Sequence, residues 1–146
     1  MKTLIKNGTI VTAAETYPAD LLIDGEKIAL IGMDLPADGA QVVDAAGKYV
    51  LPGGIDPHTH LELPFGGTVS TDDFYTGHKA AAFGGTTCHI DFAIQNKGER
   101  LHDTIQRWNQ KAAHKAVVDY SYHMAITDLN DEVMNEIPSL AAEGVT

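Results

Sequence analysis

Along residues 1–51 the apolar positions come in short runs that turn residues separate. The runs are residues 4–5, 9–12, 21–23, 27–32, 42–44 and 48–51. Asn7-Gly8 and Asp24-Gly25 each stand between two of them, and such dipeptides are the usual two-residue turns, so each predicts a tight β-hairpin. No helical period appears before Pro52. The sequence predicts a small all-β module with too little apolar content to be stable alone.

After the break at Pro52-Gly53-Gly54, the pattern changes to alternating strands and helices. Strands are predicted at residues 55–61, 86–93 and 116–126. Helices are predicted from a cap at 71–73 to about 83, at 99–115, and at 131–142 with a kink or break at Pro138. Three strand–helix units in a row are typical of a parallel α/β sheet or part of a barrel. Residues 143–146 resemble the turn into a fourth strand, and an open three-stranded parallel sheet is atypical of a finished domain.

The candidate chemistry lies in Asp56-Pro57-His58-Thr59-His60, at the end of the first of these strands. Alternate side chains of a strand share a face, so His58 and His60 are expected to project together, about 6–7 Å apart. Two imidazoles at that spacing can reach one Zn²⁺ at nitrogen–metal distances of about 2.0–2.1 Å. Asp56 is expected on the same face, where it can orient a ligand. A His-x-His triplet also occurs by chance, but active sites of barrels lie at this end of the strands, which favours a metal pair.

The run PGGIDPHTHLELPFGGTVSTDDF, followed by AAAFGGTTCHIDFA, resembles the D-hydantoinases and dihydropyrimidinases of the amidohydrolase superfamily. The resemblance extends along the whole chain. It implies the first three βα units of a TIM (β/α)8 barrel at residues 52–146, preceded by the N-terminal part of a β-sandwich domain at 1–51. It also implies that His58 and His60 bind one Zn²⁺ of a binuclear pair, and that the complete enzyme is a homotetramer.

Members of that family are much longer than 146 residues. By resemblance, the remaining metal ligands, among them a carboxylated lysine, lie beyond Thr146, as does the aspartate that moves the proton. We therefore expect the chain to be the N-terminal portion of the enzyme. It would contribute two metal ligands and no catalytic group, and it would be inactive in isolation.

The other histidines are interpreted as structural or solvent-exposed residues rather than as metal ligands. His89 and Asp91 share a face of the second strand and could imitate a ligand pair, but the family takes no ligand from that strand. Packing, or support of the ligands, is therefore favoured for both. His123 is expected to be a hydrogen-bonded core residue rather than a ligand. Three more fall on predicted helices and are expected to face solvent: His78, His102 and His114.

The loop after the motif bears on the substrate. Dihydroorotases resemble this family but carry an arginine just after the His-x-His, which pairs with a substrate carboxylate. Here no basic residue occurs before Lys79, and Leu63 and Phe65 offer apolar surface instead. By resemblance these two side chains would contact the substituent on the substrate ring, with residues 93–98 as a second loop of the pocket. The alternative is that Leu63 and Phe65 only anchor the loop.

Charge and cysteine content exclude other classes of protein. The 20 acidic and 10 basic residues give a net charge of −10, which opposes binding to nucleic acids or anionic membranes. A single cysteine excludes an intrachain disulfide and a cysteine-rich zinc site. No apolar run is long enough for a signal peptide or a membrane span, so a cytoplasmic location is expected.

Together with the His-x-His pair, the resemblance implies zinc-dependent hydrolysis of cyclic amides, either hydantoins or dihydropyrimidines, to N-carbamoyl amino acids. In the reaction that the resemblance implies, two metals activate a bridging water and polarise the carbonyl. Two alternatives stay open. One is another cyclic amidohydrolase such as an allantoinase. The other is a non-catalytic dihydropyrimidinase-like protein, although such proteins typically lack the metal histidines present here.

Overall fold

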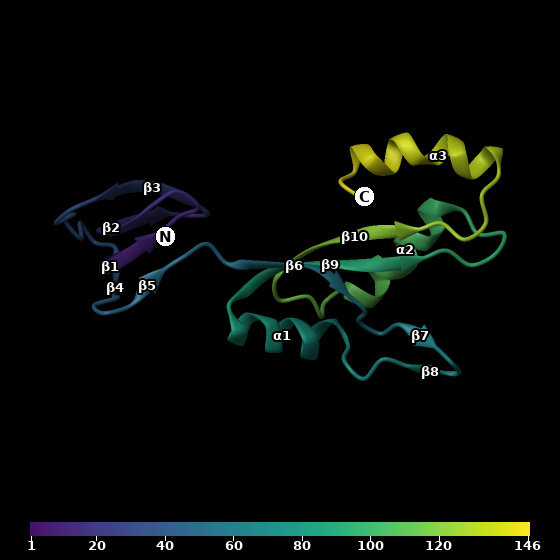
Figure 1. The fold of residues 1–146 in the computed structure, drawn as a ribbon, viewed down its shortest axis with the longest axis horizontal. Coiled ribbons are helices and arrows are strands. Elements are labelled where there is room, and N and C mark those ends of the chain that lie inside the picture. Colours follow the sequence, from purple (N-terminus) through teal and green to yellow (C-terminus); the bar gives the residue numbers. More distant parts are fainter. The chain divides into compact units, whose positions relative to one another are not determined.

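The computed structural model describes all 146 residues, which divide into two compact units, Met1–Pro52 and Gly53–Thr146. The first unit consists of β-strands alone (Figure 1). They are β1 (Lys2–Val11), β2 (Thr16–Asp24), β3 (Lys27–Gly32), β4 (Gln41–Asp44) and β5 (Tyr49–Val50). The sheet has the order β3-β2-β1-β4, and β5 also pairs with β1. β2 and β3 are antiparallel to their neighbours, whereas β4 and β5 run parallel to β1, so the sheet is mixed.

One of the two predicted hairpins is wrong. β1 continues through Asn7-Gly8 as a single strand, and its register with β2 shifts between Ile5 and Gly8, which makes a bulge instead of a turn. Asn7 has a φ of 62°, and its backbone N–H donates to the carboxylate of Asp20 over 2.8 Å. Asparagine tolerates the left-handed conformation that turns and bulges both use, so the dipeptide alone does not separate them. The second predicted hairpin, between β2 and β3, is confirmed.

The sheet of the first unit buries little apolar surface. Its buried cluster contains only Ile10, Ala19 and Leu21. On β3, by contrast, Ile28 and Leu30 stay 63% and 54% exposed. The small core expected from the sequence is what the structure has.

The second unit alternates strands and helices, as the pattern predicts (Figure 1). Its elements are β6 (Gly54–Thr59), β7 (Pro64–Phe65), β8 (Thr68–Val69), α1 (Phe74–Gly84), β9 (Thr86–Ile94), α2 (Leu101–Ala112), β10 (Asp119–Ala125) and α3 (Asp131–Ala142). The main sheet has the order β10-β9-β6 with parallel pairing throughout, which confirms the α/β class. α1 packs against β9, α2 against β9 and β10, and α3 against α2. None of these helices has the length and apolar character that crossing a membrane requires.

Local capping explains where α1 begins and ends. Asp73 accepts the backbone N–H of Thr76 over 2.8 Å, and the Thr76 hydroxyl accepts the N–H of Asp73, which is a reciprocal capping box. Gly85 ends the helix at a φ of 87°. α3 is not split at Pro138. α2 is shorter than predicted and ends at Ala112, so His114 lies beyond the helix, exposed and with a φ of 62°.

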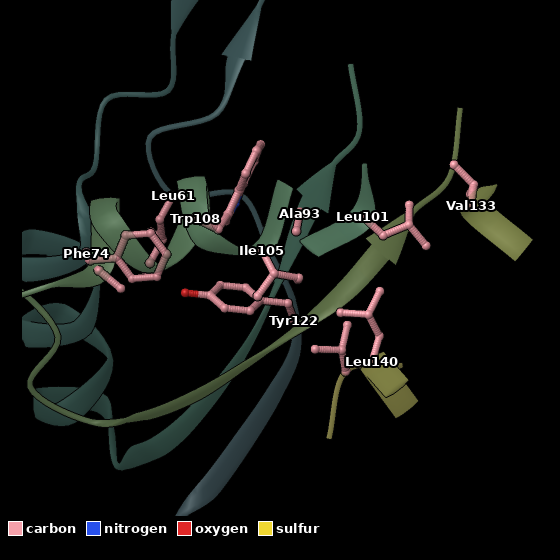
Figure 2. Packing of buried hydrophobic residues seen from close by; sticks show 11 residues of the cluster. Leu61, Phe74, Ala93, Leu101, Ile105, Trp108, Tyr122, Val133 and Leu140 are labelled. Atoms are coloured by element: carbon pink, nitrogen blue, oxygen red, sulfur yellow. The ribbon is translucent and has the colours of Figure 1, made fainter. Parts of the chain in front are cut away.

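The core of the second unit lies between the helices and one face of the sheet (Figure 2). The predicted stripe of α2 is buried there: Leu101, Ile105, Trp108 and Ala112. It packs with Ala93 of β9 and Tyr122 of β10 (Figure 2). On β9 the odd-numbered residues 89, 91 and 93 are buried, whereas the even-numbered residues 88 to 94 are only partly buried. The sheet therefore has a helix-covered face and an open face.

The last residue of the chain lies in strand register beside β10. The backbone N–H of Thr146 donates to the carbonyl of Tyr122 over 3.1 Å, and the N–H of Met124 donates to the carbonyl of Thr146 over 2.7 Å. This is the pairing of a parallel strand. Residues 143–146 thus turn back to the sheet as their sequence predicts, with Gly144 at a φ of 86°.

Candidate metal centre

His58 and His60 project together on the open face of the sheet. Their ring centroids are 5.0 Å apart with planes at 85°, and both side chains are exposed. Both rings contact Phe92 of β9, at centroid distances of 4.5 Å and 5.2 Å. The phenyl ring is thus an apolar surface under both imidazoles. The juxtaposition expected from strand alternation is present.

The strand is irregular where the pair begins. The register of β6 with β9 shifts between Gly54 and Ile55 and again between Asp56 and Thr59. Pro57, inside the second shift, has no N–H for a ladder bond. Asp56 accepts the backbone N–H of His58 over 3.2 Å, so its carboxylate contacts the backbone of that histidine and not its ring. The ligand-orienting role predicted for Asp56 stays a prediction.

A buried carboxylate lies under the histidine pair, on the helix-covered face. Asp91 is fully buried, and its Oδ2 accepts the hydroxyl of Thr59 over 2.9 Å and the backbone N–H of Leu61 over 2.8 Å. Thr59 and Leu61 alternate with the two histidines along the chain. The sequence pattern places Asp91 with His89 on one face of the strand but does not reveal these partners. The available signal was an acid inside the apolar run Ile90 to Ala93, since a buried charge needs compensating partners.

The prediction that His78 faces solvent is wrong. His78 lies on the side of α1 that packs against β9 and is fully buried. The centroid of its ring is 4.7 Å from that of the nearly buried His89. Its Nδ1 accepts the backbone N–H of Val117 over 3.3 Å. Burial, followed by the proximity of His89, lowers the pKa of His78, while Asp91 opposes this by raising it. These two histidines pack in the core, which agrees with the packing role favoured for His89.

His123 of β10 is hydrogen-bonded, as predicted, but it lies half-exposed on the open face and not in the core. Its Nε2 lies 3.0 Å from the carbonyl of Pro57, and its Nδ1 lies 2.6 Å from the hydroxyl of Thr146. A carbonyl only accepts, so Nε2 carries the proton and Nδ1 accepts from the threonine. The ring therefore links β10 to β6 across Phe92, with both nitrogens engaged.

The two apolar residues of the loop after the motif differ in how deeply they are buried. Leu63 is half-buried against the core of the second unit. Phe65 is 81% exposed in the β7–β8 hairpin. Leu63 also lines a small pocket of about 80 Å³ with Ile94 and Asn96, so the loop at 93–98 does meet the loop after the motif. The remaining lining residues are Pro64, Arg107 and Trp108.

Two lysines contact this loop: Lys111 of α2 and Lys115, which follows that helix. Lys115 Nζ lies 2.9 Å from the Glu62 carboxylate, which is the main cause of its raised pKa, and 3.5 Å from that of Asp73. Lys111 Nζ donates to the Glu62 carbonyl over 2.8 Å. Sequence spacing did not reveal these contacts, because the lysines follow the motif by some fifty residues. Both cations are engaged by the loop.

The donor set fits half of a zinc site. Two exposed imidazole nitrogens on one surface suit Zn²⁺, which takes about four ligands in protein sites. No cluster of three or more His, Cys, Asp or Glu side chains in the chain is arranged to hold a metal. The two imidazoles thus lie together without a third side chain that could complete a metal site.

Comparison with known proteins places these residues in a family, although no family model matches the chain. The chain is 58% identical over 147 residues to a D-hydantoinase of Geobacillus stearothermophilus, which covers 100% of the chain and 31% of that relative. It is 45% identical over 145 residues to a dihydropyrimidinase of Rattus norvegicus, covering 96% of the chain and 28% of the relative. The chain thus spans about a third of the length of these relatives.

Solved structures agree. The crystal structure of a dihydropyrimidinase from Brevibacillus agri matches with a TM-score of 0.97 at 58% identity, over 100% of this chain and 32% of that one. A dihydroorotase matches with a TM-score of 0.56 at 22% identity over 84% of this chain, a likeness of fold alone. By sequence along its whole length and by fold, the chain belongs to the D-hydantoinase and dihydropyrimidinase family.

Proposed function

We propose that these residues form the N-terminal part of a zinc-dependent enzyme that opens cyclic amides, hydantoins or dihydropyrimidines, to N-carbamoyl amino acids. The observation that carries the proposal is the pair of exposed imidazoles, His58 and His60, 5.0 Å apart on the open face of a parallel sheet. The relatives named D-hydantoinase and dihydropyrimidinase support the substrate class. In this proposal residues 52–146 contribute the first three βα units of a TIM barrel, and residues 1–51 contribute strands to a β-sandwich.

The proposal extends to the complete enzyme. A cytoplasmic homotetramer is the form that composition and family resemblance favour. The remaining metal ligands, and the group that protonates the leaving nitrogen, would come from residues outside these 146. The isolated chain is accordingly expected to be inactive.

Each residue of the site has a defined task in this proposal. His58 and His60 hold one Zn²⁺ through a nitrogen each, and Phe92 restricts how far both rings can turn toward the sheet. When bound, zinc lowers the pKa of water and polarises a carbonyl, which is the chemistry that amide hydrolysis needs. Asp56 holds the backbone of His58 through its N–H. The open face thus presents a fixed pair of ligands to the substrate side.

The loop after the motif favours an uncharged ring substrate. Leu63 and Phe65 would contact the ring substituent, and Phe65 is free to do so at 81% exposure. The nearby cations Lys111 and Lys115 are bound to Glu62. A substrate carboxylate would therefore meet no unengaged cation from this loop.

Parallel assays of the complete enzyme with hydantoin, dihydrouracil and allantoin test the proposed function. Hydrolysis of hydantoin or dihydrouracil is expected to exceed that of allantoin, and His58→Ala is expected to abolish it. His114→Ala is a matched control, because His114 is exposed and lies outside the site. Preference for allantoin, or full activity of the His58→Ala enzyme, would contradict the proposal.

A further inference from the structure

Every group around the buried carboxylate of Asp91 donates a hydrogen bond. Besides Thr59 and Leu61 at Oδ2, the N–H of Phe92 donates to Oδ1 over 2.8 Å and the indole N–H of Trp108 over 3.2 Å. An ionised carboxylate offers about four acceptor positions and no donor. Four donors therefore match the ionised form. Lys111 lies 4.1 Å from the centre of the Trp108 ring, which places a positive charge behind one of these donors.

This carboxylate holds the chain at the irregular end of the pairing between β6 and β9. The register between β6 and β9 shifts between Asp56 and Thr59, so regular backbone pairing does not fix the segment that carries the histidines. The bonds from Asp91 to Thr59 and Leu61 lie on either side of His60. They add side-chain bonds where the ladder ends, since Thr59 is the last residue of β6 that pairs with β9.

Because side chains alternate along a strand, the bonds from Asp91 also determine the face to which the two histidines point. Because successive side chains of a strand point to opposite faces, drawing Thr59 and Leu61 to the helix-covered face directs His58 and His60 to the open face. Leu61 is additionally buried in the core, which prevents the segment from rotating. The direction of both imidazoles thus depends on one buried acid on the neighbouring strand.

We propose that Asp91 is a positioning residue of the metal centre, which sets the geometry of His58 and His60 by clamping Thr59 and Leu61. The inference rests on the proposed function, in which the two histidines bind zinc. A purely structural Asp91 would stabilise the second unit without changing metal affinity when the fold survives.

Zinc affinity of the complete enzyme, measured by competition with a chromophoric chelator, separates these roles. Thr59→Val removes one hydroxyl and keeps the side-chain shape. It is expected to weaken zinc binding several-fold, whereas Thr59→Ser, which retains the hydroxyl, restores it. Asp91→Asn turns an amide toward donors and is expected to weaken binding by about 10-fold or more, as loss of support for metal ligands does. With Co²⁺ as the probe, the visible absorption of the bound ion should shift in both weakened variants.

A double-mutant cycle decides whether Asp91 acts through Thr59. In the Asp91→Asn protein, adding Thr59→Val is expected to cause no further loss of affinity. Asp20→Asn is the matched control, because Asp20 is also a buried carboxylate with two backbone N–H donors but lies in the first unit. It should leave zinc affinity unchanged.

Unchanged zinc affinity in Thr59→Val overturns the inference, even if Asp91→Asn fails to fold. Losses that simply add in the double variant also overturn it. The His58→Ala variant distinguishes failure of the positioning role from failure of the proposed function. If His58→Ala loses zinc while Thr59→Val does not, only the positioning role fails. If His58→Ala binds zinc as tightly as the unmodified enzyme, the proposed function fails first.

Discussion

At the residue scale, the second unit buries ionisable side chains in two chemically opposite ways. Asp91 is surrounded by donors that satisfy its charge. His78 and His89, close by, are buried with ring nitrogens that form no hydrogen bond to the protein: Nε2 of His78 and both nitrogens of His89. Buried polar atoms without partners are costly, and more so when charged. Burial lowers the pKa of His78, so the titration of this side chain should affect stability.

The buried histidine predicts a pH dependence of folding. The pKa of His78 is lowered from 6.5, chiefly by burial and next by His89 on β9, against the opposing charge of Asp91. The unfolded chain binds a proton below about pH 6.5 that the folded protein rejects. The contribution of His78 is thus fully present above that pH and is lost as the pH falls. We expect the free energy of unfolding, measured by urea denaturation, to decrease from pH 7.5 to pH 5.5.

Two asparagine variants isolate that contribution. His78→Asn keeps an acceptor for the Val117 N–H and removes the titrating ring, so the decrease should become smaller. His114→Asn is the control, because His114 is exposed and asparagine tolerates its φ of 62°. An equal decrease in the His78→Asn protein and the unmodified protein would contradict this account.

The sequence alone predicts the histidine pair, but it does not predict the buried residues around the pair. A period of two residues places His58 and His60 on one face whatever the rest of the fold does. The burial of His78 depends on which side of α1 meets β9, and that helix is apolar over most of its surface, so its pattern left the buried side undetermined. The partners of Asp91 come from β6, α2 and the loop after the motif, a convergence that only tertiary structure reveals.

At the element scale, α1 lies unusually close to the loop that follows the motif. A Cβ added to Gly77 would come within 2.4 Å of Cδ2 of Leu61, the residue that Asp91 also holds. The absence of a side chain at Gly77 therefore lets the helix pack against Leu61. This contact joins the helix layer to the end of β6.

Substitution of the helix glycines tests that packing. Gly77→Ala should lower the free energy of unfolding by about 1–3 kcal/mol, because overpacking of the buried Leu61 exceeds the gain in helix propensity. Gly84→Ala in the same helix meets no atom within 4 Å and should be neutral or stabilising. Thermal unfolding of both variants measures the difference. Stabilisation by Gly77→Ala would show that the helix does not depend on this close approach.

The types of the elements were easier to predict from the sequence than their bounds and pairing. Helix α1 begins and ends where its capping residues predict. The Asn7-Gly8 dipeptide failed as a hairpin signal because residues on both sides of it pair with β2, which only the partner strand determines. α2 is shorter than predicted at both ends, since it begins at Leu101 and ends at Ala112. Glu99, just before the helix, is in ionic contact with Arg107, which lowers the pKa of Glu99 to about 2.

At the scale of the whole molecule, the two units differ in how much they bury. The second unit has a continuous core from Leu61 to Val145, whereas the first has three buried residues in its cluster. The chain spans about a third of the relatives that it matches. The central claim concerns the larger unit. We propose that its open face carries two ligands, His58 and His60, of a metal centre that other residues of the complete enzyme would finish.

The most direct test of that claim is a crystal structure of the complete enzyme grown with zinc, with anomalous data on both sides of the zinc absorption edge. The account predicts a zinc peak about 2.0–2.1 Å from one nitrogen of His58 and one of His60. The same peak should be absent from the His58→Ala/His60→Ala protein. A zinc peak bound by other residues, with both imidazoles uncoordinated, would contradict the account.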